Sequence, residues 1–143
     1  MNLIADTGAI YALYDMDDRH HQSVYDFVKN NVGKIIIPSI ILVEIDYLLR
    51  EFLGVSAELD FIADVLDGAY QINTFTLEDL KRCEELISQY RDLDLGLADA
   101  SVIITAEKLN IYHILTVDQR DFRAVKPKKK PFVLLPSDLP YLK

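Results

Sequence analysis

Short apolar runs recur along the chain, and several are followed at once by a polar or turn-forming residue. Continuous β-branched or leucine-rich runs of this length are typical of strands buried on both faces of a sheet. The third of these runs, "AYQINTF", has the weakest strand pattern. The expected strands are residues 2–6, 34–38, 69–75, 112–118 and 132–136.

Longer segments between these runs carry apolar residues at helical spacing. Thr76 is followed three residues later by Asp79, which is close to a capping box. Ser39 and Ser56 are of a residue type that commonly caps a helix, so each predicts a helix start. The expected helices begin near residue 7 or 8 and then cover about 19–31, 39–52, 56–67, 76–90 and 98–110.

The alternation of strands and helices predicts an α/β fold with a mostly parallel sheet and helices on both faces. A chain of 143 residues is long enough for one domain with one core, and no linker or repeat divides residues 1–143. In such folds the working site lies beyond the carboxyl ends of the strands. Asp6 and Asp118 both occupy that edge in this interpretation.

Composition narrows the class of protein. The formal net charge is −8, which disfavours broad nonspecific binding to nucleic acid. No apolar run is long enough to span a bilayer, and no signal segment is visible, so we expect a cytoplasmic protein without a membrane partner. Cys83 is the only cysteine. The cations are unevenly placed, because six of them crowd residues 120–130 with only Asp121 opposing them.

Two carboxylates interrupt apolar segments. Asp6 directly follows the first strand, where burial makes its charge costly. Glu44 sits in a segment that is apolar nearly all round, which predicts a buried helix with the glutamate in the core or at a crevice. The alternatives are structural: Asp6 could cap the next helix, and Glu44 could share a narrow solvated face with Asp46.

Two later aspartates lie at comparable places. Asp99 begins an apolar helix, where the helix dipole alone could explain it. Asp118 follows the fourth strand, where a turn residue is an equally simple reading. Asp121 is a weaker candidate for the same role. Thr7 and Thr116 adjoin the strand-end acids, and their hydroxyls could orient a carboxylate or water, or bond local backbone.

Taken together, these acids predict one crevice. Four carboxylates cannot all stay ionised there without a counterion, because like charges raise one another's pKa values. Mg²⁺ or Mn²⁺ prefers oxygen ligands and would relieve the repulsion. Asp6, Asp99 and Asp118 are the expected metal ligands. Glu44 could bind the metal or hold the attacking water.

Four motifs carry a family resemblance. "DTGAIYAL", "PSIILVEI", "GLADASVIITAEKL" and "ILTVDQRDFRAVKP" resemble, in order and separation, the motifs of PIN-domain ribonucleases, above all VapC-type toxins of toxin–antitoxin pairs. The resemblance implies a three-layer PIN-like fold with a five-stranded, mainly parallel sheet flanked by helices. It implies that Asp6, Glu44, Asp99 and Asp118 are catalytic. Gly8 stands where a serine is common in the family.

The resemblance also implies an activity and partners. The expected function is Mg²⁺- or Mn²⁺-dependent hydrolysis of RNA by an endoribonuclease that pairs as a homodimer and is inhibited by a small antitoxin protein. Thr7 and Thr116 match the family's hydroxyl-bearing positions. Hydrolysis by water, with the metal lowering its pKa, would leave a 3′-hydroxyl and a 5′-phosphate.

The cationic segment has two readings. It could guide RNA toward Asp118, or it could be a solvated, proline-stiffened connection. The candidate RNA-binding residues are Arg120, Arg123, Lys128, Lys129 and Lys130.

Other classes of function also place acids around a Mg²⁺ ion. A phosphoacceptor signalling domain needs a mid-chain aspartate at a strand end, and none is visible. A non-catalytic module with a Mg²⁺-binding acidic pocket, a nuclease acting on DNA, and a PIN-like nuclease outside a toxin–antitoxin pair remain alternatives.

Overall fold

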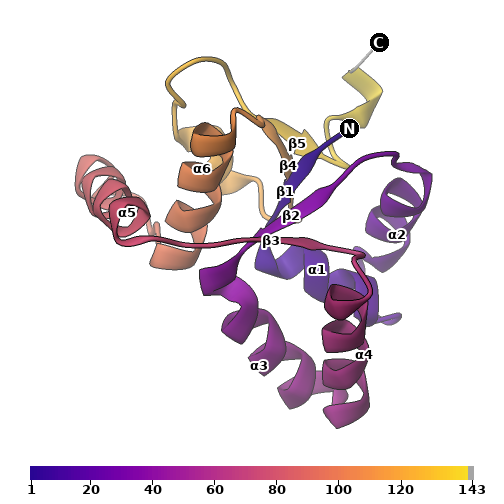
Figure 1. Cartoon of the computed structure of the whole chain (residues 1–143). Coiled ribbons are helices and arrows are strands. Elements are labelled where there is room, and N and C mark those ends of the chain that lie inside the picture. The colour runs from indigo at the N-terminus through magenta and orange to yellow at the C-terminus, as the bar shows by residue number, and fades with distance from the viewer. Residues whose placement is uncertain (142–143) are drawn as a thin grey trace.

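A five-stranded sheet forms the centre of the computed structural model, which describes residues 1–141 (Figure 1). All four strand pairings are parallel, so the mainly parallel sheet of the prediction is confirmed in its strictest form. The first strand of the chain is central, with Ile4 paired to Ile36 on one side and Ile114 on the other. Across the sheet the order is β3 (Gln71–Asn73), β2 (Ile35–Pro38), β1 (Leu3–Ala5), β4 (His113–Leu115) and β5 (Val133–Leu135).

Helices cover both faces of this sheet, as expected. In Figure 1, α5 and α6 lie on one side, α1 and α2 lie on the other, and α3 and α4 project below the sheet as a hairpin. Within the described residues, no helix is both long enough and apolar enough to cross a bilayer. The α-helices are α1 (Thr7–Tyr14), α2 (His21–Asn30), α3 (Leu42–Leu53), α4 (Val55–Leu66), α5 (Leu77–Gln89), α6 (Leu97–Leu109) and α7 (Arg120–Ala124).

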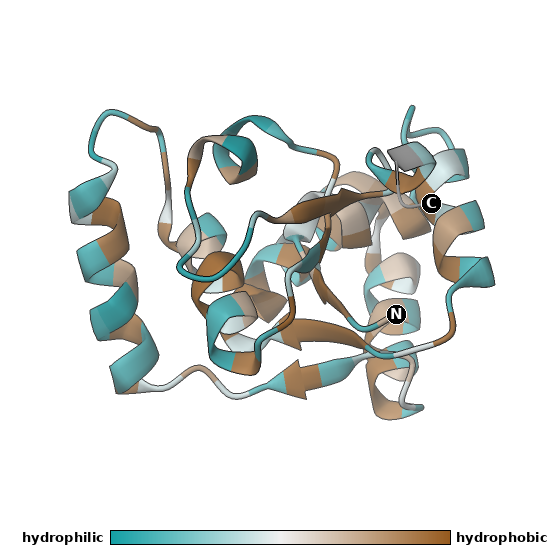
Figure 2. Cartoon of the chain, turned by 90° about the horizontal axis from the view of Figure 1, so that it is seen from above, coloured by the Kyte–Doolittle hydropathy of each residue, from teal (hydrophilic) through white to brown (hydrophobic). Residues whose placement is uncertain are grey.

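Burial explains why the strands read as continuous apolar runs. Every residue of β1 and β2 is buried, since helices cover both faces. Figure 2 shows the strands as mostly hydrophobic, whereas the outer helices alternate hydrophobic and hydrophilic positions. Helix α6 is buried over residues 100–106 because it packs between the sheet and α5.

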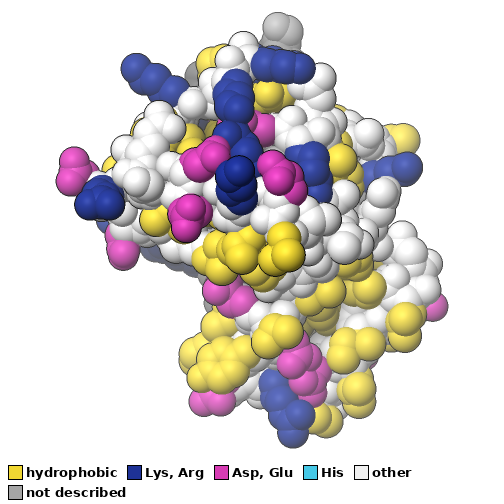
Figure 3. All heavy atoms as spheres, turned by 60° about the vertical axis from the view of Figure 1, so that its left-hand side comes forward, with side chains coloured by type: hydrophobic (Ala, Val, Ile, Leu, Met, Phe, Trp, Pro, Cys, Tyr) yellow, Lys and Arg dark blue, Asp and Glu magenta, His cyan; other side chains and the backbone are white. Residues whose placement is uncertain are grey.

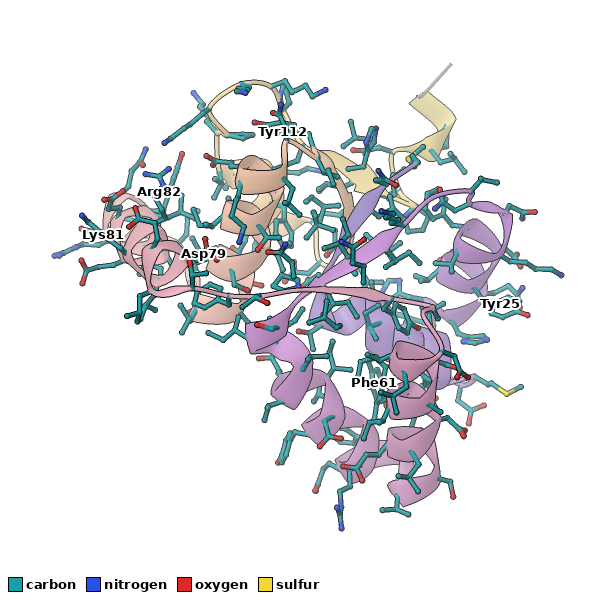
Figure 4. The ribbon with its side chains drawn as sticks, in the orientation of Figure 1. Tyr25, Phe61, Asp79, Lys81, Arg82 and Tyr112 are labelled. Carbon is teal, nitrogen blue, oxygen red and sulfur yellow. The ribbon has the colours of Figure 1, made fainter. Side chains whose placement is uncertain are left out.

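Polar contacts fix α5 against α6. Thr76 and Asp79 form the capping box that the sequence predicts. The Asp79 carboxylate also accepts a hydrogen bond from the Lys108 ammonium at 2.8 Å. Figure 4 shows Asp79 on the side of α5 that faces α6. Burial raises the pKa of Asp79, but the Lys108 contact and the cap outweigh it and leave the pKa below its usual value.

Two predicted helix starts are wrong. Ser39 begins a short 3₁₀ turn, η1 (Ser39–Ile41), and α3 starts after it at Leu42. The Ser39 hydroxyl instead accepts a hydrogen bond from the Phe75 amide at 2.9 Å, which joins the chain beyond β2 to the chain beyond β3. Ser56 is also not a cap, because α4 begins at Val55 directly after Gly54.

The expectation of a buried helix over residues 39–52 is also wrong. Only Ile45 and Leu49 of α3 are buried, whereas Val43 is 76% exposed and Tyr47 is 61% exposed. The reason is that the α3–α4 hairpin projects from the body (Figure 1), so one face of α3 is left exposed among the described residues. A five-residue helix, α7, was not expected, and it follows Asp118 within two residues.

Candidate active site

Asp6 lies where β1 becomes α1 and does two things there. It is the N-cap of α1, and its Oδ1 accepts a hydrogen bond from the Thr7 amide at 2.8 Å. Its backbone amide still continues the sheet by donating to the Leu115 carbonyl at 2.9 Å. Asp6 can therefore cap α1 and also take part in a site, because its second carboxylate oxygen, Oδ2, is left for other partners.

Thr116 provides one of those partners. Its Oγ1 lies 3.1 Å from Oδ2 of Asp6, and it accepts a hydrogen bond from the Asp118 amide at 3.0 Å. The same oxygen lies 2.9 Å from the Asp118 carbonyl. A hydroxyl has one proton, so Thr116 donates either to Asp6 or to that carbonyl. Thr116 thus joins the end of β1 to the turn after β4.

Asp118 keeps the turn role that the sequence allowed. Its Oδ1 accepts a hydrogen bond from the Arg120 amide at 3.2 Å, two residues on, as in an Asx turn. Asp121 follows on α7 and is buried, with 5% of its surface exposed. Helix α7 therefore buries the side chain of Asp121 and leaves that of Arg120 exposed.

Asp99 lies in the first turn of α6, as expected. Its pKa is raised to about 6, first by burial and then by the negative charges of Asp121, Asp118 and Glu44. The negative charges of acids on α3, on α7 and in the turn after β4 therefore all act on Asp99. This is the convergence that the sequence predicts, with Asp121 contributing more than its place as a weaker candidate suggested.

Asp6 belongs to the same neighbourhood. Burial raises its pKa to about 7, repulsion from Asp99 adds to this, and Asp118 adds a smaller contribution. The hydrogen bonds from Thr7 and Thr116 act in the opposite direction. A carboxyl group whose pKa is raised by burial together with a nearby negative charge, despite two hydrogen-bond donors, is typical of a functional site.

Glu44 occupies the open side of the site. It lies in the first turn of α3 and is exposed, so the core position is excluded and the crevice edge remains. Its charge still reaches Asp99. A purely solvated position explains the exposure of Glu44 but not its effect on the pKa of Asp99.

The donors fit a hard cation that keeps part of its water. All the candidate ligands are oxygens, and the Thr7 hydroxyl is buried without a hydrogen-bond partner among the described residues. Within residues 1–141, no three His, Cys, Asp or Glu side chains come close enough together to enclose an ion. Mg²⁺ is usually bound by one or two carboxylates plus water, so this wider arrangement suits it and does not suit zinc.

The structure separates the candidate RNA-binding cations. Arg120 is near the acids, with its Nε 4.0 Å from Oδ1 of Asp121. Arg123 is held by Asp138 at 2.6 Å and by Gln119 at 2.8 Å. Lys128, Lys129 and Lys130 lie in the loop that leads to β5, and Lys130 reaches the ring of Tyr112 at the amino end of β4. These lysines are not at the acid edge of the sheet.

One site feature was missed by the sequence reading. A Cβ atom added at Gly8 would lie 3.1 Å from Cγ2 of Val117. The first turn of α1 therefore packs tightly against the chain after β4, which helps to place Asp6 beside Thr116. Glycine at this position gives room for that approach, and the loss of a serine hydroxyl is not its only effect.

Comparison with known proteins agrees with this geometry. The sequence model of the PIN domain family matches residues 3–127 of this chain. The chain belongs to the PIN-domain family. It is 27% identical to ribonuclease VapC26 of Mycobacterium tuberculosis over 125 residues, which is 87% of this chain and 93% of that protein.

Solved structures show the same PIN-domain fold. VapC20, a Mycobacterium tuberculosis toxin that cleaves the sarcin–ricin loop, matches with a TM-score of 0.81 and 19% identity, over 90% of this chain and 98% of VapC20. A chain of the VapBC2 structure from Rickettsia felis, determined with a DNA fragment from its promoter, matches at 0.66 and 18% identity, over 94% and 97%. The PIN-like architecture that the sequence predicts is thus confirmed.

Proposed function

We propose that this PIN domain is a divalent-metal-dependent endoribonuclease and the toxin of a toxin–antitoxin pair. The observation that supports the proposal is electrostatic: besides burial, the negative charges of Glu44 and Asp118 raise the pKa of Asp99, and those of Asp99 and Asp118 raise the pKa of Asp6, although the four acids come from separate parts of the chain. The VapC relative and the structural neighbours support RNA as the substrate.

The chain's own residues have distinct parts in this proposal. Asp6, Asp99 and Asp118 would hold Mg²⁺ or Mn²⁺, directly or through bound water, and the bound ion would lower the pKa of water and stabilise charge on the phosphate. Thr116 holds the Asp6 carboxylate in place, and α7 carries Asp121, whose charge acts on Asp99. Glu44, on the open side, either ligates the metal or holds the attacking water.

The acids also set the protonation state of the free site. Burial and repulsion keep protons on Asp6 and Asp99 to higher pH than usual. Because protons and a cation compete for the same oxygens, the affinity for metal should rise as pH increases through this range. Hydrolysis by water predicts RNA products with a 3′-hydroxyl and a 5′-phosphate.

The decisive experiment is cleavage of RNA by the purified protein with and without Mg²⁺, followed by analysis of the product ends. We expect cleavage that needs the metal and is abolished in Asp99→Asn. The matched control is Asp60→Asn, which removes a carboxylate from the exposed face of α4 and should cleave normally. Products with a 2′,3′-cyclic phosphate, or full cleavage by Asp99→Asn, would contradict the mechanism. Cleavage of DNA but not RNA would contradict the substrate.

The proposal includes protein partners. Toxin–antitoxin complexes among the structural neighbours support a small antitoxin, and we also propose a homodimer. Figure 3 shows hydrophobic side chains gathered over the lower part of the molecule, where α3 and α4 project. There, Phe52, Leu59 and Leu66 are 58–80% exposed, which suits a protein interface. Cellular RNA as substrate would place the action in the cytoplasm.

A further inference from the structure

The loop between α7 and β5, residues 125–132, concentrates positive charge on an acidic protein. Lys126, Lys128, Lys129 and Lys130 lie in it, and no acid occurs between Asp121 and Asp138. All four lysines are exposed. Within residues 1–141, none of the four has a carboxylate within ion-pair distance. Their charge is therefore available to an external anion.

This loop is held in shape at several points. The Lys126 amide donates to the Tyr90 hydroxyl at 3.0 Å, and Val125 is buried with 3% exposed. At the other end the Phe132 ring stacks on Tyr112, with their centroids 5.9 Å apart, and Lys130 lies over the same tyrosine at 5.4 Å. Pro127 and Pro131 further restrict the backbone. A loop with these attachments presents its lysines in a fixed place.

The loop and α7 enclose a hollow of about 570 Å³, here called the basic hollow. Aromatic and proline side chains line it together with cations, and the cations are Arg123, Lys126, Lys129 and Lys130. Phe122 and Phe132 are only 2% and 8% exposed, so the apolar surface left to a ligand is mainly that of Pro127 and Pro131. Cations beside this apolar surface suit a nucleic acid strand, which offers phosphates and bases together. An anion without apolar groups would contact the cations of this lining but not its apolar side chains.

Position connects the basic hollow to the acid site. Tyr112 and Thr116 flank the two ends of β4, four positions apart along the chain, or about 13 Å of strand. Figure 4 shows Tyr112 beside the loop at the top of the molecule. Helix α7 belongs to both places, because the charge of Asp121 acts on Asp99 and Arg123 lines the hollow.

We propose that the basic hollow binds the backbone of an RNA strand on one side of the cut, as an anchor separate from the acidic centre. This rests on the proposed RNA-cleaving function and assigns Lys129 and Lys130, which line the hollow, to that anchor instead of to the scissile phosphate, with Lys128 beside them in the same loop adding charge at its rim. Affinity for RNA then comes largely from outside the metal site, where the acids repel phosphate. Substrates that extend over α7 are bound more tightly than short oligonucleotides that fill only the acid site.

The test measures binding without cleavage. Fluorescence anisotropy of a labelled single-stranded RNA in EDTA gives the affinity across a range of salt concentrations. We expect the triple variant Lys128→Gln, Lys129→Gln, Lys130→Gln to lose about tenfold or more in affinity, and the slope of log K against log salt to fall by about 2 in magnitude. The double variant Lys128→Gln, Lys129→Gln keeps the Lys130–Tyr112 contact and should show an intermediate loss.

The matched control removes the same charge elsewhere. Lys29, Lys34 and Lys81 are exposed on other elements, and their triple replacement by Gln should leave affinity and salt slope close to those of the unmodified protein. Equal losses in both triple variants would overturn the anchor, since net charge alone would explain them. Displacement of the RNA by polyglutamate at equal charge concentration would also overturn it, in favour of an acidic protein segment.

Outcomes for the anchor and for the enzyme are separable. Metal-dependent cleavage with RNA binding that ignores the lysines would reject the anchor and leave the proposed function standing. Lysine-dependent binding without any cleavage would support the anchor and reject the nuclease.

Discussion

The Oγ1 of Thr116 lies 3.1 Å from Oδ2 of Asp6, although 110 residues separate them in the chain. This contact joins the central strand to its neighbour β4 at the edge where the acids meet. It also stabilises the charged form of a carboxylate whose pKa is otherwise raised by burial and by Asp99. The hydroxyl therefore serves both the fold and the proposed chemistry.

Replacing Thr116 by Val tests that dual role. The change keeps the shape but removes the hydroxyl, so the pKa of Asp6 should rise further and the free energy of unfolding should fall by about 1–2 kcal/mol. Cleavage should fall by about 10- to 100-fold, as for other groups that orient a metal ligand. Urea denaturation and initial rates measure the two effects. Thr116→Ser restores the hydroxyl and should recover most of the rate; no recovery would show that the methyl group matters instead.

Removing one acid should stabilise the metal-free protein. Because the pKa of Asp99 is raised to about 6, the folded protein keeps a proton that the unfolded chain releases between about pH 4 and pH 6. The free energy of unfolding of the unmodified protein therefore falls as pH rises through this window, and Asp6 extends the fall to about pH 7. Asn cannot ionise, so Asp99→Asn removes the part of this fall in stability that is due to Asp99.

The measurement compares chemical denaturation of the two proteins in EDTA at pH 4.5 and pH 8. Asp99→Asn should be more stable than the unmodified protein by about 1–3 kcal/mol at pH 8 and should lose this advantage near pH 4. Adding Mg²⁺ at pH 8 should stabilise the unmodified protein more than the variant. If Asp99→Asn is more stable by the same amount at both pH values, burial and the acidic neighbours do not raise the pKa of Asp99.

The contact between α5 and α6 should matter for stability alone. Lys108→Met leaves the buried Asp79 carboxylate without its cation while keeping the length of the side chain. We expect the free energy of unfolding to fall by about 1–3 kcal/mol. Lys81→Met, on the exposed face of α5, should change it by less than about 0.5 kcal/mol. A change in the Mg²⁺ dependence of cleavage in Lys108→Met would contradict a purely structural role.

A second polar network attaches α4 to the body. The Tyr14 hydroxyl lies 2.6 Å from Oδ2 of Asp64 and 2.8 Å from the Tyr70 hydroxyl. Tyr14→Phe should lower the free energy of unfolding by about 1–2 kcal/mol, because both partners lose a hydrogen bond in a half-buried place. Hydrogen exchange should then show faster opening of α4 than of α6. Equal acceleration in both helices would mean that the loss is global.

The sequence predicted the parts of the fold that depend on local pattern. The buried runs around Ile4, Ile36 and Ile114 indicated the strands, and strict alternation with helices indicated the parallel sheet. Thr76 was identified as a cap because its partner Asp79 is only three residues away. Ser39 looked equally convincing, but its hydroxyl is used by Phe75, a residue that only the tertiary structure brings near.

The site was predictable in outline for the same reason. Asp6 and Asp118 follow strands, and parallel strands end at one edge, so their proximity followed from topology. The exposure of Glu44 did not follow, because apolar residues on α3 indicate burial without saying whether this chain or another covers them. The sequence also does not predict that Lys128, Lys129 and Lys130 lie away from the acids, because this depends on the path of the loop after α7.

The tight approach of Gly8 to Val117 has a consequence for how this protein can change over generations. A Cβ atom at position 8 would lie 3.1 Å from Cγ2 of Val117, so Val117 must shift by a few tenths of an ångström or give way to a smaller residue. These two positions should therefore covary among homologous sequences, with serine or alanine at the first accompanied by a trimmed partner at the second. The acids themselves can stay constant while this pair drifts, provided that the two substitutions occur together.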